Sequence, residues 1–226
     1  MYTILIDTST EKGVIALADH HTLRLTKDLP LELNQSISLW PHLQDLFEIL
    51  AVNSLKIDCI AVGKGPGSYT GMRVGVAVAK AFAYAGKIPL IGISSLKVFL
   101  PHAEGKFAVL IDAKIAGVYI IKGIRNAQGV HYLSDPEVCA WEKLETYLDG
   151  IQMLVTPNKS LSLKLNKHYP QTTWVIQETK VNAPHFLRLA QDKYERHDYS
   201  EKGRLDLLYL RQTQAEIEKR NKIDKL

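Results

Sequence analysis

YTILIDTSTEKGVIALADH (residues 2–20) and FAVLIDAKIAGVYIIKGIR (residues 107–125) follow the same design. In each stretch an apolar segment ends in Ile-Asp, a turn that contains a glycine follows, and a second apolar segment comes after it. Short apolar segments separated by a polar turn are typical of paired strands. The two copies lie about half a chain length apart. That period is too long for a solenoid and suits the duplication of a whole lobe.

The segments between the two copies complete the first lobe. Apolar segments predict further strands at residues 22–29, 57–63 and 88–94. Apolar residues at helical spacing predict helices at residues 36–50 and 71–86, and a short helical piece near 96–101. Pro41 predicts that the first of these helices begins near Trp40 or is kinked there.

The second half of the chain has a weaker pattern after Asp135. It predicts helices at residues 141–148 and 183–196, strands at 153–157 and 174–177, and a charged, solvated last helix near 212–225. We therefore predict an α/β fold of two duplicated βββαβα-type lobes that meet at a cleft. The first lobe is expected at residues 1–103, and a smaller, diverged lobe at residues 104–226.

The composition bounds the class of protein. A chain of 226 residues that is 46% hydrophobic can build a sizeable core. Its net charge of +4 is compatible with an RNA nearby but does not require one. Cys59 and Cys139 are far apart and form no CxxC, which is typical of a reduced, cytoplasmic protein. The first ten residues have no basic segment and include Asp7, and no apolar run suits a membrane span. We therefore expect neither a secretory signal nor a membrane partner.

The run GKGPGSYTGMRVGVAVAKAF (residues 63–82) is the densest glycine segment of the chain. It lacks the Gly-Lys-Ser/Thr of a phosphate-binding P-loop, and Thr70 stands where a dinucleotide fingerprint needs its third glycine. The run still joins a predicted strand to a predicted helix, which Ser68 or Thr70 can cap. Free backbone N–H groups there would suit an anion. An anion site and an ordinary connecting loop both stay open at this point.

Small residues recur every four positions in the helix that follows. Gly71, Gly75, Ala79 and Ala83 form one stripe with almost no side chain. A glycine inside a helix costs about 1 kcal/mol relative to alanine, so the stripe indicates close approach of another backbone. That backbone belongs either to the lobe itself or to the helix of a partner. From spacing alone, packing within the lobe is favoured.

The sequence predicts no catalytic and no metal-binding residue. Its histidines form neither HxxxH nor HExxH, and there is no GxSxG elbow. Asp7 and Asp112 follow strands, where a carboxylate can orient a metal or phosphate or simply form the turn. The turn is favoured for both, because the rest of a nucleotide site is missing.

Several stretches of this chain resemble the bacterial TsaB (YeaZ) family. They are ILIDTST (4–10), GKGPGSYTGMRVGVAVAKAFA (63–83), IPLIGISSL (88–96) and LIDAKIAGVY (110–119). The glycine segment, with Met72-Arg73 and Gly75 after it, is highly specific to the family. The resemblance covers residues 1–120, and beyond them only LYLR (208–211) is similar to the family's closing Tyr-x-Arg segment.

The resemblance implies a two-lobed, actin-like ATPase (ASKHA) fold and a protein that is not itself an enzyme. It implies a partner, TsaD, which carries the metal-binding histidines, and a small ATPase, TsaE, that joins them. Together they add threonylcarbamoyl to N6 of adenosine 37 in tRNAs that read ANN codons. No cofactor is expected on this chain, because ATP and metal belong to TsaD or TsaE. When alone, members of the family can form homodimers through the same face.

The resemblance also suggests which residues act. Pairing with TsaD is expected through the helices at 36–50 and 71–86. Their candidate contact residues are Leu39, Leu43, Leu46, Phe47, Gly71, Arg73, Gly75, Ala79 and Ala83. The candidate remnants of a nucleotide loop are Asp7, Thr8 and Asp112. The chain departs from the family at Gln35, Lys64 and Lys114, where the family has a histidine and two arginines.

A second hypothesis is an ATP-binding, phosphotransferase-like enzyme of the same fold. It predicts tight, magnesium-dependent binding of ATP by the isolated chain. A peptidase conflicts with the absence of any catalytic constellation in the sequence.

Overall fold

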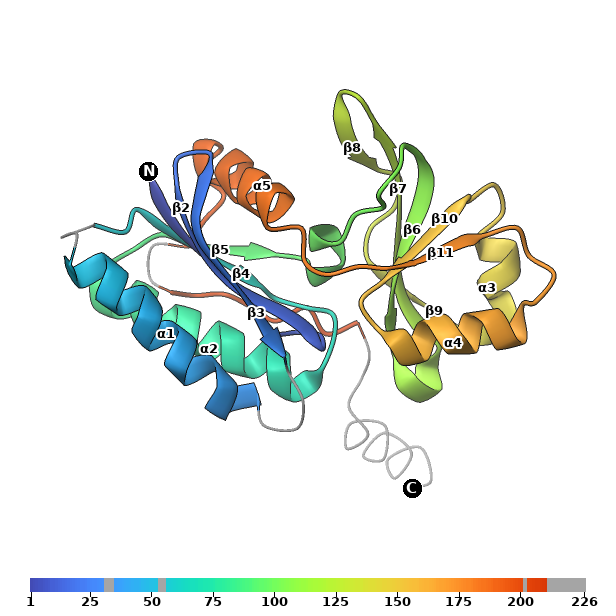
Figure 1. Cartoon of the computed structure of the whole chain (residues 1–226), viewed down its shortest axis with the longest axis horizontal. Helices are drawn as coiled ribbons and strands as arrows, with labels where there is room; N and C mark the ends of the chain where they lie inside the picture. The colour runs from blue at the N-terminus through green and yellow to red at the C-terminus, as the bar shows by residue number, and fades with distance from the viewer. Residues whose placement is uncertain (31–34, 53–55, 201–202, 211–226) are drawn as a thin grey trace, which may run out of the picture.

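The computed structural model describes residues 1–30, 35–52, 56–200 and 203–210, and these form two lobes of α/β structure (Figure 1). The expected last helix near 212–225 lies outside the described residues. The first lobe contains β1 (Tyr2–Asp7), β2 (Lys12–Asp19), β3 (Thr22–Pro30), α1 (Gln35–Val52), β4 (Cys59–Gly63), α2 (Tyr69–Gly86) and β5 (Leu90–Ile93). A short 3₁₀ helix, Ser95–Val98, stands where a helical piece near 96–101 was predicted.

The second lobe follows the same plan. It contains β6 (Gly105–Asp112), β7 (Val118–Asn126), β8 (Gly129–Tyr132), β9 (Glu137–Cys139), α3 (Trp141–Tyr147), β10 (Met153–Thr156), α4 (Lys159–His168) and β11 (Val175–Glu178). A single 3₁₀ turn, Lys114–Ala116, connects β6 to β7. The last described helix is α5 (Ala183–Glu195).

The two sheets have the same strand order, which confirms the predicted duplication. The first sheet runs β3-β2-β1-β4-β5, and the second, read from the equivalent edge, runs β8-β7-β6-β10-β11, with β9 as an additional strand paired to β7. In each sheet the first strand of the lobe pairs antiparallel with the next strand and parallel with the strand after the first helix. Asp7 pairs with Val14 and Asp112 with Val118, so each aspartate ends the first strand of its lobe.

Alternation along the strands divides the core into layers. In β1, Ile4 and Ile6 face α1 and α2, whereas Leu5 faces a central cluster shared by both lobes. In β6, Phe107 and Val109 join the same central cluster. Figure 1 shows α1 and α2 on one face of the first sheet and α5 on the other.

The chain returns to the first lobe after β11, so residues 104–226 are not one lobe as expected. Helix α5 packs on the first sheet, and Ser200 pairs with Leu90 at the free edge of β5. Farther on, the backbone N–H of Leu208 donates to the carbonyl of Lys64 at 2.8 Å. The physical reason is that the first sheet has an apolar face, which Phe186 and Leu187 of α5 cover.

Helix α1 begins at Gln35 rather than near Trp40, and Pro41 lies inside it. The leucines Leu39, Leu43, Leu46 and Leu50 are buried on one side of the helix. Pro41 is on the exposed side, where water can satisfy the carbonyl that loses its N–H partner. Burial of the leucines therefore outweighs the local preference of proline. Among the helices of the described part of the chain, none is long and apolar enough to cross a membrane.

Candidate functional site

The aspartates that end β1 and β6 form the same turn in both lobes. The Oδ1 atom of Asp7 accepts from the backbone N–H of Ser9 at 2.8 Å, and Oδ1 of Asp112 accepts from that of Lys114 at 2.8 Å. A side chain that bonds the backbone two residues on is the usual Asx turn. The turn role that the sequence favoured for both residues is therefore present in the structure.

The first of these aspartates, Asp7, lies in the interior of the first lobe. Asp7 is fully buried, and its Oδ2 atom forms no hydrogen bond with any described residue. Burial raises the pKa of Asp7, and the nearby hydroxyl groups of Ser9 and Ser95 lower it by less. Thr8 is buried as well, and its hydroxyl group donates to the carbonyl of Gly71 at 2.6 Å. These candidate nucleotide-loop residues thus support the packing of the first lobe.

The second aspartate, Asp112, lies next to two lysine side chains. The Nζ atoms of Lys114 and Lys164 each lie 3.4 Å from Oδ2 of Asp112. Burial alone would raise the pKa of this carboxyl, but the Lys114 backbone N–H and the two ammonium groups together hold it below its usual value. Asp112 is therefore paired in its own lobe.

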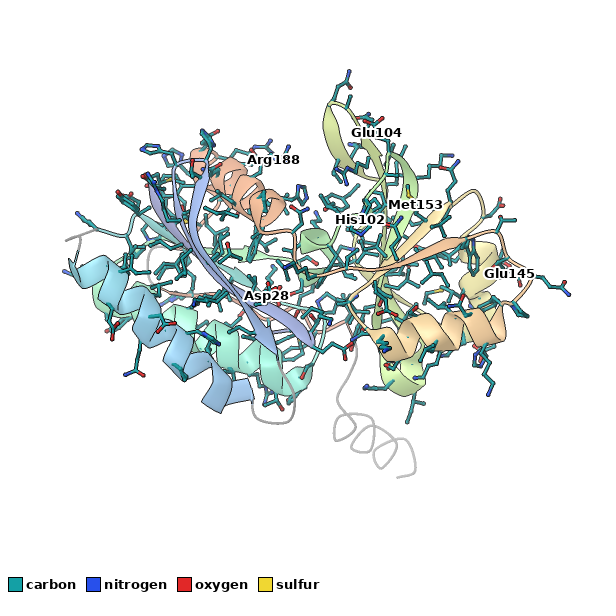
Figure 2. All side chains as sticks on the ribbon, viewed as in Figure 1. Asp28, His102, Glu104, Glu145, Met153 and Arg188 are labelled. Carbon is teal, nitrogen blue, oxygen red and sulfur yellow. The ribbon has the colours of Figure 1, made fainter. Side chains whose placement is uncertain are left out.

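An open cleft of about 850 Å³ lies between the two lobes. Its lining is charged with both signs, and one member, Asp28, is seen near the end of β3 in Figure 2. The lining residues are Glu11, Lys12, Gly13, Asp28, Leu29, Lys159, Glu178, Thr179 and Lys180. Two contacts cross between the lobes there. Lys180 Nζ lies 2.8 Å from Asp28 Oδ2, and the backbone N–H of Lys159 donates to Glu11 Oε1 at 3.0 Å.

The glycine loop between β4 and α2 is packed against the lobe, which favours the connecting-loop interpretation. The backbone N–H of Lys64 donates to the carbonyl of Ile93, and that of Ser68 donates to the carbonyl of Ser9. The N–H of Gly65 donates to Ser95 Oγ at 3.1 Å. Ser68 caps α2 by accepting from the N–H of Gly71 at 3.3 Å. Four N–H groups of the loop and the helix start are therefore already bonded within the lobe.

The small-residue stripe of α2 faces the lobe's own sheet. Gly71, Gly75, Ala79 and Ala83 are all buried. A Cβ atom on Gly75 would lie 2.3 Å from Oγ1 of Thr8, so only glycine lets the helix approach the end of β1 this closely. The expectation that this stripe contacts a partner is corrected, because close packing within the lobe already uses it.

The candidate contact residues of α1 also face the lobe's own sheet. Leu39, Leu43 and Leu46 are buried against the first sheet, with at most 2% of each exposed. The side chain of Phe47 lies outside the described residues. The periodicity that suggested these positions marks the buried face of the helix and not its outer face.

Apart from Arg73, the outer face of α2 is made of residues that the sequence analysis did not single out. We use this term for Arg73, Ala77, Ala81 and Ala85, which follow one another every four positions and are exposed. Helix faces exposed to water usually carry charged side chains, but this one carries a single charge at its beginning. A second alanine series, offset by two residues from the buried stripe, was the signal in the sequence.

Arg73 is the only sequence-predicted contact residue of α2 that is exposed, and it is held in a defined position. Its guanidinium carbon lies 3.8 Å from the centre of the Tyr69 ring. Its Nε donates to the hydroxyl group of Tyr209 at 2.9 Å, and the two tyrosine rings are 5.6 Å apart. Tyr209 comes from the segment that returns to the first lobe. This pairing across the whole chain could not be found from local spacing.

The described residues contain no group of three or more histidine, cysteine, aspartate or glutamate side chains that could hold a metal ion. Both cysteines are buried and free, and burial raises the pKa of Cys59 to about 12. His185 is also buried, which lowers its pKa to about 4. These groups belong to the core of the molecule and not to an open reactive site.

Comparison with known proteins gives consistent relatives. The model of the family described as TsaD, tRNA N6-adenosine threonylcarbamoyltransferase, matches residues 33–178. The tRNA threonylcarbamoyladenosine biosynthesis protein TsaB of Escherichia coli (strain K12) is 33% identical over 143 residues, which cover 61% of each chain. TsaB of Bacillus subtilis (strain 168) is 34% identical over 122 residues, or 53% of each chain. The chain therefore matches little more than half the length of these curated relatives.

Solved structures agree on the fold. YeaZ from Pseudomonas aeruginosa has a TM-score of 0.76 and 22% identity, and the match covers 92% of this chain and 99% of that one. A Pseudomonas aeruginosa protein described as similar to the peptidase YeaZ has a TM-score of 0.77 at 22% identity, with coverage of 93% and 99%. The expected two-lobed α/β fold is thereby confirmed.

Proposed function

Because this chain belongs to the TsaB/YeaZ family, within the wider group that the TsaD model describes, we propose that it is a non-catalytic subunit that docks with and activates TsaD. The activity it supports is N6-threonylcarbamoylation of adenosine 37 in tRNAs that read ANN codons. TsaE joins through the complex, and ATP and metal are bound by TsaD or TsaE. The coarser role, in tRNA threonylcarbamoyladenosine biosynthesis, is that of the family.

The outer face of α2 is the observation that carries the docking proposal. Ala77, Ala81 and Ala85 leave a smooth, exposed strip along which a second helix can approach closely. Arg73, fixed between Tyr69 and Tyr209, provides an oriented cation at one end of the strip. In the isolated chain the apolar surface of the strip stays in contact with water. Packing it against a helix of TsaD removes that surface from water, which has a favourable free energy. Without TsaD, a second copy of this chain can occupy the strip.

The non-catalytic part of the proposal is supported by the two strand-end aspartates. An ATP-using phosphotransferase of this fold would need carboxylates open to the cleft. Asp7 is fully buried, and Asp112 is covered by Lys114 and Lys164. No specific observation therefore favours the phosphotransferase alternative.

The test combines binding and activity. The chain is mixed with TsaD of the same organism and run on a size-exclusion column, and tRNA modification is measured with TsaE and a supply of threonylcarbamoyl-AMP. Ala81→Glu places a charge in the strip and should abolish co-elution and lower modification at least tenfold. Ala127→Glu, at an exposed position in the β7–β8 turn, is the matched control and should change neither.

Two results would contradict the proposal. One is full modification by TsaD without this chain. The other is unchanged co-elution of the Ala81→Glu variant, provided that its melting temperature equals that of the wild type.

A further inference from the structure

We propose that α4 carries an RNA-binding surface, on which lysines contact tRNA phosphates and the exposed ring of His168 stacks on a base. This inference rests on the proposed function, because that function supplies tRNA as the RNA. It deepens the proposal by giving this subunit its own contact with the substrate.

The exposed side of α4 is basic. Lys159, Lys164 and Lys167 all lie on its solvent side, and the helix contains no acidic residue. Leu161 and Leu165 are fully buried and attach the opposite side to the second sheet. The lysines are thus displayed by a helix whose orientation is fixed, which is how phosphate contacts position a nucleic acid.

Neighbouring elements extend this basic surface. Lys12 lines the same cleft as Lys159, where Glu11, Asp28 and Glu178 balance the charge, so the basic surface continues on the other side of the helix start. Lys114 lies beside Lys164, because both ammonium groups are 3.4 Å from the same carboxylate of Asp112. One carboxylate shared by two lysines leaves an excess of positive charge. Such an excess attracts a polyanion and releases its counterions on binding.

An aromatic stack stands at the C-terminal end of the basic helix. The rings of His168 and Trp141 are 5.6 Å apart and inclined by only 23°. The imidazole is held by a 2.9 Å hydrogen bond between its Nδ1 atom and the carbonyl of Lys164. Behind it, the Tyr169 hydroxyl group donates to the carbonyl of Trp141 at 2.7 Å. His168 is exposed, so one face of a fixed stack is open to a base.

Acidic residues of the neighbouring helix α3 limit where RNA can bind on this surface. Glu142 and Glu145 of α3 are exposed. Figure 2 shows Glu145 at the end of the second lobe that is remote from the first lobe. These carboxylates repel phosphate, so the RNA path runs from the stack along the lysines of α4.

The proposed RNA-binding surface and the outer face of α2 lie on equivalent helices of different lobes. Helix α4 occupies in the second lobe the place that α2 occupies in the first, between the fourth and fifth strands of the repeat. The outer face of α2 is lined by alanines, whereas that of α4 carries three lysines with Leu163 exposed among them. An acidic protein could also meet the lysines, but the flat, open ring at the end of the row suits a nucleic acid base.

The experiment measures binding of a fluorescent, unmodified tRNA transcript by anisotropy over a series of salt concentrations. It uses both the isolated full chain and its complex with TsaD. In Lys164→Gln/Lys167→Gln, we expect about tenfold weaker binding near 0.1 M salt, and a salt dependence (log K against log salt) reduced by about one to two. His168→Ala should weaken tRNA binding about fivefold or more. The same His168→Ala change should leave the binding of heparin, a polyanion without bases, unaltered.

Lys56→Gln/Lys106→Gln is the matched control, since it removes the same charge at exposed positions. Lys56 precedes β4 and Lys106 is the second residue of β6, so neither belongs to α4. The control should bind tRNA like the wild type.

Equal tRNA affinity of the α4 variants and the control would overturn the proposal. A loss of TsaD co-elution by the α4 variants with tRNA binding unchanged would also overturn it, because the surface would then be a protein contact. Failure of the wild-type chain to pair with TsaD would contradict the proposed function alone. The isolated chain would still decide whether α4 binds RNA.

Discussion

At the scale of single residues, the two lobes put equivalent aspartates in opposite electrostatic environments. Burial raises the pKa of Asp7, which has no salt bridge with the described residues, whereas Asp112 lies between two lysines and has a lowered pKa. The sequence was sufficient to pair these residues and to favour their turn role. It could not predict the difference, because Lys164 reaches Asp112 only through the folding of α4.

This contrast predicts opposite pH dependences of stability. The folded state binds the proton of Asp7 more tightly than the unfolded chain does, so this residue's contribution is full below about pH 4 and is lost as pH rises through the folded pKa. The contribution of Asp112 is present above about pH 4 and is lost as pH falls through its folded pKa. Asp7→Asn should therefore flatten the neutral side of the stability profile, and Asp112→Asn the acid side.

Urea unfolding of both variants and the wild type between pH 3 and pH 8 checks this. Each variant is the control for the other. Parallel profiles for Asp7→Asn and the wild type would show that the buried carboxyl does not hold its proton in the folded state.

At the scale of elements, spacing located α1, α2, α3 and α5 but did not distinguish buried from exposed faces. The four-residue repeat in α2 was real, yet it faces β1, and the exposed series is the one two residues away. Helix α4 was missed altogether. Its leucines at 161, 163 and 165 alternate as in a strand, and the helix is apparent only once Leu161 and Leu165 are seen buried with Leu163 exposed.

The contact between α2 and β1 gives a prediction for helix packing. Gly75→Ala should destabilise the protein by about 1–3 kcal/mol, because the new methyl group would overlap the Thr8 hydroxyl group in a filled core. In a Thr8→Ala background the same change should cost less, since that hydroxyl group is absent. Chemical unfolding of the four proteins of this double-mutant cycle measures the coupling. Additive effects would mean that the two positions do not meet.

At the scale of the whole molecule, the lobes share their central core. Phe186 of α5 is fully buried in a cluster that includes Leu5 of the first sheet and Val109 of the second. The duplication and the cleft could be predicted from the sequence. The return of α5 to the first lobe could not, because an amphipathic helix does not reveal which of two apolar sheets it covers.

This shared core predicts one cooperative transition. Phe186→Ala should destabilise the protein by about 3–5 kcal/mol and shift the unfolding of both lobes together. Tryptophan fluorescence and far-UV circular dichroism should report the same midpoint. Arg188→Ala, on the exposed side of the same helix (Figure 2), is the control and should cost little. Separate midpoints for the two signals in the Phe186 variant would contradict a common core.

The placement of α5 also sets the order in which the molecule is completed on the ribosome. The strands of the first sheet are synthesised first, but the helix that covers one of their faces is made only after all the strands of the second lobe. The nascent chain therefore presents Leu5, Val14 and Ile91 uncovered while some ninety further residues are added. The second lobe, which is continuous in sequence, can close before the first. The lobe that is translated first is finished last, and this interval is when a chaperone would protect the protein from aggregation.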